Sequence, residues 1–292
     1  MRSRIVIAAL LSIGSVTTVW AQGQNSASYL SQAFIRVTDS ASGAAKLGNF
    51  GYDDGISILA AWVDCRDSVM YYVPLTKGVN YMFVAGGDND SQDVNLEIQN
   101  ADGKTVASEN RVAADAMLTL TAPTTDWYTL KLTLAKSRAN LPCVCVACIL
   151  KEDGHQVPLK QLDDSADRLM KLFTETDKLL QKENKRLEFR RARNQWGLYG
   201  SVLAQGQKIS VTNLDLGAGR RLFLGLGDKN TEDVDLFILD AKGNVAAADQ
   251  KANSEAIIGF TPANERYGLR MLNFKGSGPA VIMTGIFDVL QR

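Results

Sequence analysis

The strongest constraint on the fold of this 292-residue chain is an internal repeat with an offset of 140 residues. The Gly-Asp pair at 87–88 recurs at 227–228, and the alternating segment 93–98 recurs at 233–238. The matches keep their order across the whole unit, with one deletion near its end. Two copies are fewer than the three or more that a stacked solenoid needs, so each copy should bury a core of its own.

Each copy carries the period-two pattern of β-strands. Val94, Leu96 and Ile98 alternate with polar residues, which is typical of a strand with one buried face. Glycine-containing turns at 101–104 and 241–244 follow, and further short apolar segments recur at intervals of about ten residues. The sequence therefore predicts a mainly β protein of two tandem jelly-roll-like antiparallel β-sandwiches.

A helical segment precedes each predicted sandwich. In the second, apolar residues recur at helical spacing, which predicts an amphipathic helix that packs on a sandwich and bridges the two units; a dimerising coiled coil is the alternative. A basic cluster is expected at the end of this helix, where cations complement the helix dipole. The apolar residues are Leu162, Ala166, Leu169, Phe173, Leu180 and Leu187, and the basic ones are Lys185, Arg186, Arg190, Arg191 and Arg193.

The start of the chain has the layout of a secretory signal peptide. Arg2 and Arg4 precede the apolar run 5–16, and the segment 19–21 ends in Ala21, after which we expect cleavage. The run is shorter than the ~20 residues that span a bilayer, and no later segment is long enough. We predict an exported protein, periplasmic or at the cell surface; a buried N-terminal helix is the alternative.

These patterns together divide the chain into five segments. They are a signal peptide at 1–21, an N-terminal helical segment at 22–46, a first β-sandwich at 47–152, a linker with the amphipathic helix at 153–195, and a second β-sandwich at 196–292.

Composition and motifs argue against nucleic acid and against common catalytic classes. The chain has 32 basic and 32 acidic residues and one histidine, so a polyanion partner is not expected. It contains no nucleophile elbow, no zinc-protease motif and no glycine-rich phosphate loop, and we assign no catalytic residue. An uncharacterised hydrolase is an alternative, because Asp233 and Asp235 would lie on one face of an exposed strand.

The four cysteines allow several interpretations. In a strand, Cys143 and Cys145 would face one side and Cys148 the other. Their spacing differs from that of a zinc site, and a metal site is one alternative. Buried thiols are the default, and a disulfide from Cys65 to one of the other three is a second alternative.

Acidic residues gather at the two Gly-Asp turns. Oxygen ligands on a turn are what calcium requires, and calcium is the one cofactor that this sequence suggests. The alternative is that these residues only stabilise the turns through hydrogen bonds to the backbone. The candidate ligands are Asp88, Asp90, Asp93, Asp228, Asp233 and Asp235.

The second copy resembles the bacterial pre-peptidase C-terminal domain. The resemblance is carried by GDKNTEDVDLFILDAKGNVAAAD, followed by ERYGLRML; it covers residues 206–290 and more weakly 77–150. It implies a jelly-roll sandwich that binds matrix or carbohydrate with calcium at Asp228, Asp233 and Asp235, and at Asp88 and Asp93. In the first copy Asn95 replaces the second aspartate of the motif, and no peptidase domain accompanies the units.

Aromatic residues offer a second kind of ligand surface. Most should lie in the cores, with stacking on sugar rings or peptide side chains as the alternative. They are Trp62, Tyr71, Tyr72, Tyr81, Trp127, Tyr128, Trp196, Tyr199 and Tyr267. The sequence as a whole predicts a non-catalytic exported module that binds a glycan or protein ligand at the envelope through its sandwich loops. An envelope scaffold that binds partner proteins through the helices is the alternative.

Overall fold

The computed structural model describes residues 26–263 and 265–292, so the predicted signal peptide at 1–21 lies outside the described residues. The first unit comprises α1 (Ser26–Gly48), β1 (Phe50–Tyr52), β2 (Ile58–Val63), β3 (Ser68–Leu75), β4 (Asn80–Gly87), β5 (Ser91–Gln99), β6 (Thr105–Glu109), β7 (Asp115–Thr121), β8 (Asp126–Ser137) and β9 (Cys143–Glu152). The second comprises α2 (Leu159–Gln181), β10 (Lys185–Phe189), β11 (Leu198–Leu203), β12 (Lys208–Asp215), β13 (Arg221–Gly227), β14 (Thr231–Leu239), β15 (Val245–Asp249), β16 (Glu255–Phe260), β17 (Arg266–Gly276) and β18 (Ala280–Gln291).

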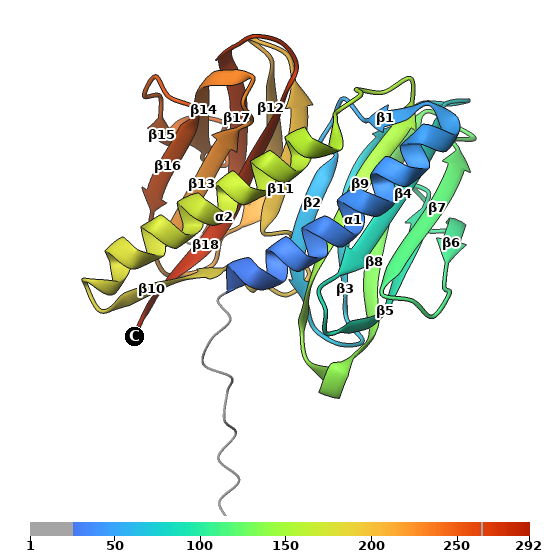
Figure 1. The fold of residues 1–292 in the computed structure, drawn as a ribbon, viewed down its shortest axis with the longest axis horizontal. Coiled ribbons are helices and arrows are strands. Elements are labelled where there is room, and N and C mark those ends of the chain that lie inside the picture. Colours follow the sequence, from blue (N-terminus) through green and yellow to red (C-terminus); the bar gives the residue numbers. More distant parts are fainter. Residues whose placement is uncertain (1–25, 264) are drawn as a thin grey trace, which may run out of the picture.

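The two units share one ten-stranded sheet (Figure 1). Its strand order is β16-β13-β18-β11-β2-β9-β4-β7, with β1 added to β9 and β10 added to β18. The units join where β2 and β11 pair antiparallel, with Ile58 opposite Gly200 and Ala60 opposite Leu198. Because β2 and β11 are equivalent strands of the repeat, this register relates the two units by an approximate two-fold axis at the central pair, Leu59 and Tyr199.

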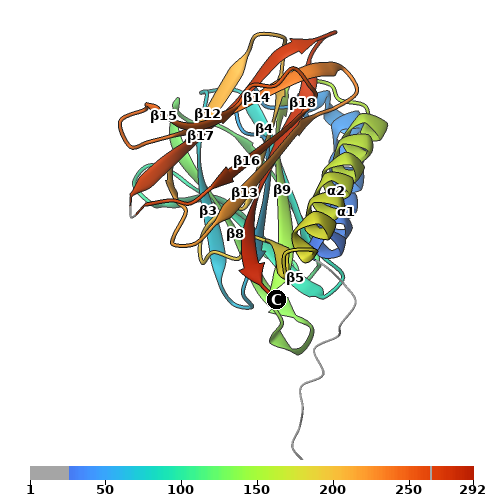
Figure 2. The same cartoon turned by 90° about the vertical axis from the view of Figure 1, so that its left-hand side faces the viewer.

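The shared sheet is covered on both faces. Two separate four-stranded sheets, β3-β8-β5-β6 and β12-β17-β14-β15, close one sandwich over each half of one face. Both helices lie side by side on the opposite face (Figure 2). Apolar side chains fill both interfaces, and the core between the sheets is continuous from one unit to the other. The predicted fold class, a mainly β protein with antiparallel sandwiches and a helix before each, is confirmed.

The predicted end of the second helix is wrong. Helix α2 stops at Gln181, and Asn184 adopts a left-handed conformation (φ 57°) that turns the chain into β10. Leu187 therefore lies in a strand, opposite Val289 of β18, and the basic cluster lies on β10 and the linker after it. The apolar stripe of the helix is buried within the chain, with Phe173 fully covered, which leaves it unavailable for a dimerising coiled coil.

The cysteines lie on both faces of β9. Cys143 and Cys145 belong to the core between the sheets, whereas Cys148 faces the helices, which confirms their predicted orientation. Cys65 is half-buried in the turn after β2, and all four thiols are free. Neither of the two described helices is long and apolar enough to cross a membrane.

Candidate functional site

The Gly-Asp turns, predicted as calcium sites, link neighbouring elements of this fold through hydrogen bonds. Asp228 is fully buried, and its carboxylate accepts hydrogen bonds from the backbone N–H groups of Val281 (2.8 Å) and Asn230 (2.8 Å). The side-chain amide of Gln161, from α2, donates to the same carboxylate. The aspartate therefore ties the end of β13 to β18 and to the helix.

Asp88 has the same role in the first unit. Its buried carboxylate accepts hydrogen bonds from the backbone N–H groups of Val144 (2.7 Å) and Asp90 (3.0 Å). Burial raises the pKa of Asp88, and these two hydrogen bonds oppose the rise. Both oxygens of Asp88 therefore serve the backbone, as those of Asp228 do.

Two helix arginines also form hydrogen bonds to the Gly-Asp turns. The Arg36 guanidinium donates to the carbonyl oxygens of Gly87 (2.5 Å) and Asp88 (2.9 Å), and Arg168 donates to that of Gly227 (2.5 Å). The repeat does not point to either arginine, because Arg36 and Arg168 stand 132 positions apart rather than the 140 of the repeat. Each helix is thus anchored on the turn of its own unit.

The other predicted ligands do not gather into a metal shell. Asp90 forms an ion pair with Arg138 (3.2 Å), and one oxygen each of Asp93 and Asp233 is buried without a hydrogen-bond partner. Among the described residues, no three His, Cys, Asp or Glu side chains come together in a way that would hold a metal ion. Calcium at these turns stays a prediction, to be checked by melting the protein in calcium and in chelator.

The hydrolase alternative requires Asp233 and Asp235 to lie on an exposed strand, but both residues are buried. Their exposed fractions are 7% and 4%. The β15–β16 turn packs along this part of β14, where the Val234 N–H donates to the Asn253 carbonyl oxygen (2.9 Å). Burial and the neighbouring Asp233 both raise the pKa of Asp235.

The raised pKa of Asp235 predicts a pH dependence. A carboxyl with a raised native pKa stabilises the fold below its unfolded pKa, and this contribution is lost as the pH rises through the native pKa. Asp235→Asn should therefore gain stability relative to the wild type between about pH 4 and about pH 7, as measured by urea unfolding. Asp240→Asn is the matched control, because hydrogen bonds from Asn244 lower the pKa of Asp240, and its trend should have the opposite sign. Parallel trends for the two variants would contradict the assignment.

Two of the nine aromatic residues that the sequence offers as a possible ligand surface project from the molecule. Tyr72 is 65% exposed and Trp127 is 58% exposed, and Met70 is 46% exposed. The others are buried or half-buried, as expected for core residues. We call Met70, Tyr72 and Trp127 the aromatic face.

The aromatic face lies on the outer surface of the β3-β8-β5-β6 sheet. Val69, Val73 and other residues of the same parity in β3 point into the core, so Met70 and Tyr72 point outward. Tyr72 pairs with Thr129 of β8, two residues from Trp127. Tyr72 and Trp127 are therefore diagonal neighbours, a relation that places Cα atoms about 7–8 Å apart on one face of an antiparallel pair.

Polar side chains flank the aromatic face on the same surface. Glu97 of β5 accepts hydrogen bonds from the Gln99 amide (2.8 Å) and the Thr105 hydroxyl, and forms an ion pair with Lys131 (3.4 Å). These hydrogen bonds and the Lys131 ammonium lower the pKa of Glu97. The surface beside the rings is therefore polar, with its opposite charges paired.

The second unit carries polar residues at the positions that match the aromatic face. The strand registers place Ser210 at the position of Met70, Thr212 and Asn213 at that of Tyr72, and Arg266 at that of Trp127. Arg266 forms an ion pair with Asp215 (3.4 Å). The two copies thus share their cores and the hydrogen bonds of their Gly-Asp turns but differ at this surface.

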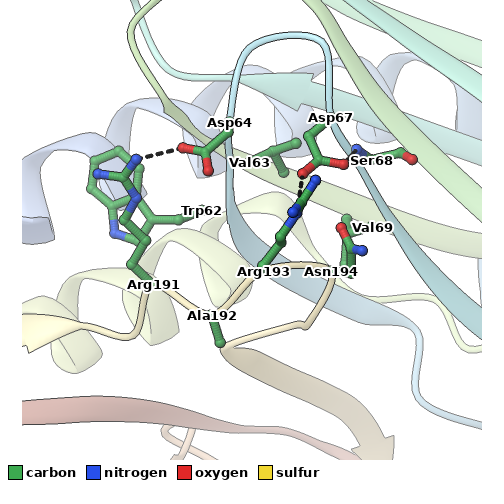
Figure 3. A pocket seen from close by; sticks show the side chains of 10 residues that line it. All are labelled: Trp62, Val63, Asp64, Asp67, Ser68, Val69, Arg191, Ala192, Arg193 and Asn194. Carbon is green, nitrogen blue, oxygen red and sulfur yellow. Dashed lines mark hydrogen bonds and ion pairs between the residues drawn. The ribbon is translucent and has the colours of Figure 1, made fainter.

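The linker between β10 and β11 contains most of the basic cluster, and its arginines are engaged within the chain. Arg191 pairs with Asp64 (2.5 Å) and Arg193 with Asp67 (3.1 Å) across a crevice beside the β2–β3 turn (Figure 3). Arg191 and Arg193 therefore hold the linker against the first unit, and the other members of the cluster are engaged with Glu183, Glu188 and the Asp215 carbonyl oxygen rather than forming a free basic patch.

No family model and no curated protein matches the sequence. Among solved structures, the PBSX exported protein XepA is 12% identical, with 81% of this chain and 88% of that chain covered and a TM-score of 0.27. The tandem CBM51 modules of a family 98 glycoside hydrolase from Streptococcus pneumoniae are 10% identical, with 81% and 88% covered and a TM-score of 0.23. PliG of Aeromonas hydrophila, a periplasmic inhibitor of g-type lysozyme, is 13% identical, with 34% and 91% covered and a TM-score of 0.24. With TM-scores below 0.3, these likenesses carry no weight for function.

Proposed function

We propose that this chain is a non-catalytic binding module, exported to the cell envelope or surface, that holds a glycan or protein ligand on the outer face of its first sandwich. The observation that supports the proposal is the aromatic face, where Tyr72 and Trp127 leave large apolar rings in solvent. Exposed apolar groups rimmed by polar ones are typical of binding surfaces.

This surface is favoured over the two other candidates in the same molecule. The loops at the Gly-Asp turns are held by Arg36 and Arg168, and the apolar stripes of both helices are covered by the shared sheet. A scaffold that bound partners through the helices would need apolar residues on their outer faces, where, among the helix side chains that the structure describes, Ile35 and Leu179 stand singly.

Co-sedimentation tests the proposal. We expect the purified protein to sediment with isolated envelopes or extracellular polymer, and the triple variant Met70→Ala, Tyr72→Ala, Trp127→Ala to lose most of this binding. Phe274→Ala is the control, because Phe274 is similarly exposed (55%) but lies in the second unit. Equal sedimentation of the triple variant and the wild type would contradict the assignment of the binding surface.

A further inference from the structure

We propose that the ligand of the aromatic face is a neutral oligosaccharide, whose sugar rings stack on Trp127 and Tyr72 while the flanking polar residues bind its hydroxyl groups. This inference rests on the proposed function and names the class of ligand. It is carried by the size of the surface, its charge, the spacing of its rings and its restriction to one unit.

The size of the aromatic face fits a sugar chain better than a protein. An aromatic side chain buries about 150–250 Å² when fully covered, and Tyr72 and Trp127 already have a third or more of their surface covered. The exposed area of these two rings is therefore well below the ~800 Å² of total surface that each partner buries in a standard protein interface. The flat C–H face of a pyranose, by contrast, matches the area of a single aromatic ring.

The charges of the surface favour a ligand without net charge. The Lys131 ammonium is already paired with Glu97, and the exposed Asp126 precedes Trp127, with its carboxylate accepting from the Trp127 N–H (2.7 Å). An anionic polymer would meet the Asp126 carboxylate, while Lys131, the cation that stands beside Met70 on these strands, is already paired with Glu97.

The polar neighbours supply the hydrogen bonds that hydroxyl groups require. Thr129 stands between Tyr72 and Gln99 across the three strands, and Lys131 stands between Met70 and Glu97. Hydroxyl, amide, ammonium and carboxylate groups thus border the rings, and a hydroxyl can donate to or accept from each according to its type. Such a mixture suits sugar hydroxyls, which both donate and accept.

The spacing and the asymmetry of the repeat set further limits on the ligand. Because the two rings are diagonal neighbours on adjacent strands, they offer two stacking positions, so the ligand should be an oligosaccharide. In the second unit Arg266 replaces Trp127 and pairs with Asp215, so each chain should bind one oligosaccharide.

Titration with defined sugars tests this inference. The neutral probes are cellohexaose, maltohexaose and hexa-N-acetylchitohexaose, and polygalacturonate is the anionic comparison. Calorimetry and tryptophan fluorescence measure the binding. We expect at least one neutral hexasaccharide to bind with a stoichiometry of one and to shift the emission of the exposed Trp127. Trp127→Ala and Tyr72→Ala should each weaken binding about tenfold or more, Trp127→Phe should retain most of it, and Arg266→Ala should leave it unchanged.

Each outcome separates this inference from the proposed function. Unchanged hexasaccharide affinity in Trp127→Ala and Tyr72→Ala, or tighter binding of polygalacturonate, overturns the inference. If no neutral probe binds while the triple variant still loses co-sedimentation, the ligand class is wrong and the binding surface stands. If no probe binds and co-sedimentation is unaffected by the triple variant, both proposals fail. Unchanged melting temperatures exclude misfolding, since all three side chains are exposed.

Discussion

Asp228→Ala is expected to lower the free energy of unfolding by about 3–5 kcal/mol. The substitution leaves the backbone N–H groups of Val281 and Asn230, together with the Gln161 amide, without their acceptor at a fully buried position. Each buried donor that loses its partner costs about 1–3 kcal/mol. Urea unfolding followed by circular dichroism measures the loss.

Two further variants separate this mechanism from a general effect of substitution in the turn. Asp228→Asn keeps one acceptor oxygen, so it should fall between the wild type and the alanine variant. Asp88→Ala should resemble Asp228→Ala, because Asp88 accepts two equivalent backbone hydrogen bonds. If Asp228→Ala lowers the free energy of unfolding by less than about 1 kcal/mol, the hydrogen bonds of the carboxylate do not stabilise the fold as described.

Trp196→Ala is expected to lower the free energy of unfolding by about 3–5 kcal/mol. Trp196 is 3% exposed, and its indole Nε1–H donates to the Met70 carbonyl oxygen (2.9 Å) on the edge strand β3. Its loss leaves a cavity in the core and uncovers part of that edge, and an unprotected edge promotes aggregation. Thermal melting and light scattering measure the two effects.

Trp127→Ala is the matched control for this prediction. It removes the same side chain from an exposed position, where substitutions usually change stability by less than about 0.5 kcal/mol. Similar destabilisation by the two substitutions would contradict the different places that the structure gives to the two tryptophans.

The β-sandwiches could be predicted from the sequence because alternation and turns are local signals. The continuity of the shared sheet could not be predicted. Strand β2 (Ile58–Val63) is covered on both faces, so its sequence has no polar alternation to indicate its orientation or its partner. Strand β11 is buried in the same way, and pairing between two such strands is decided by the tertiary fold.

The outward orientation of Tyr72 and Trp127 could be predicted from the sequence. The apolar parity of Val69, Val73 and Leu75 predicts that Tyr72 faces outward, and the parity of Leu130 and Leu132 predicts the same for Trp127. The burial of Asp233 and Asp235 could not be predicted in this way. It depends on the β15–β16 turn, which is remote from both residues in the chain and lies beside them only in the folded protein.

The approximate two-fold axis between β2 and β11 has a consequence for how the protein holds together at low concentration. Two separate copies of one unit, pairing through this strand, would form a symmetric dimer whose assembly depended on concentration. In this chain the two partners are covalently linked, so the pairing is intramolecular and persists on dilution. The linkage also permits what a dimer of identical chains cannot have: one half can carry Trp127 while the other carries Arg266 at the matching position.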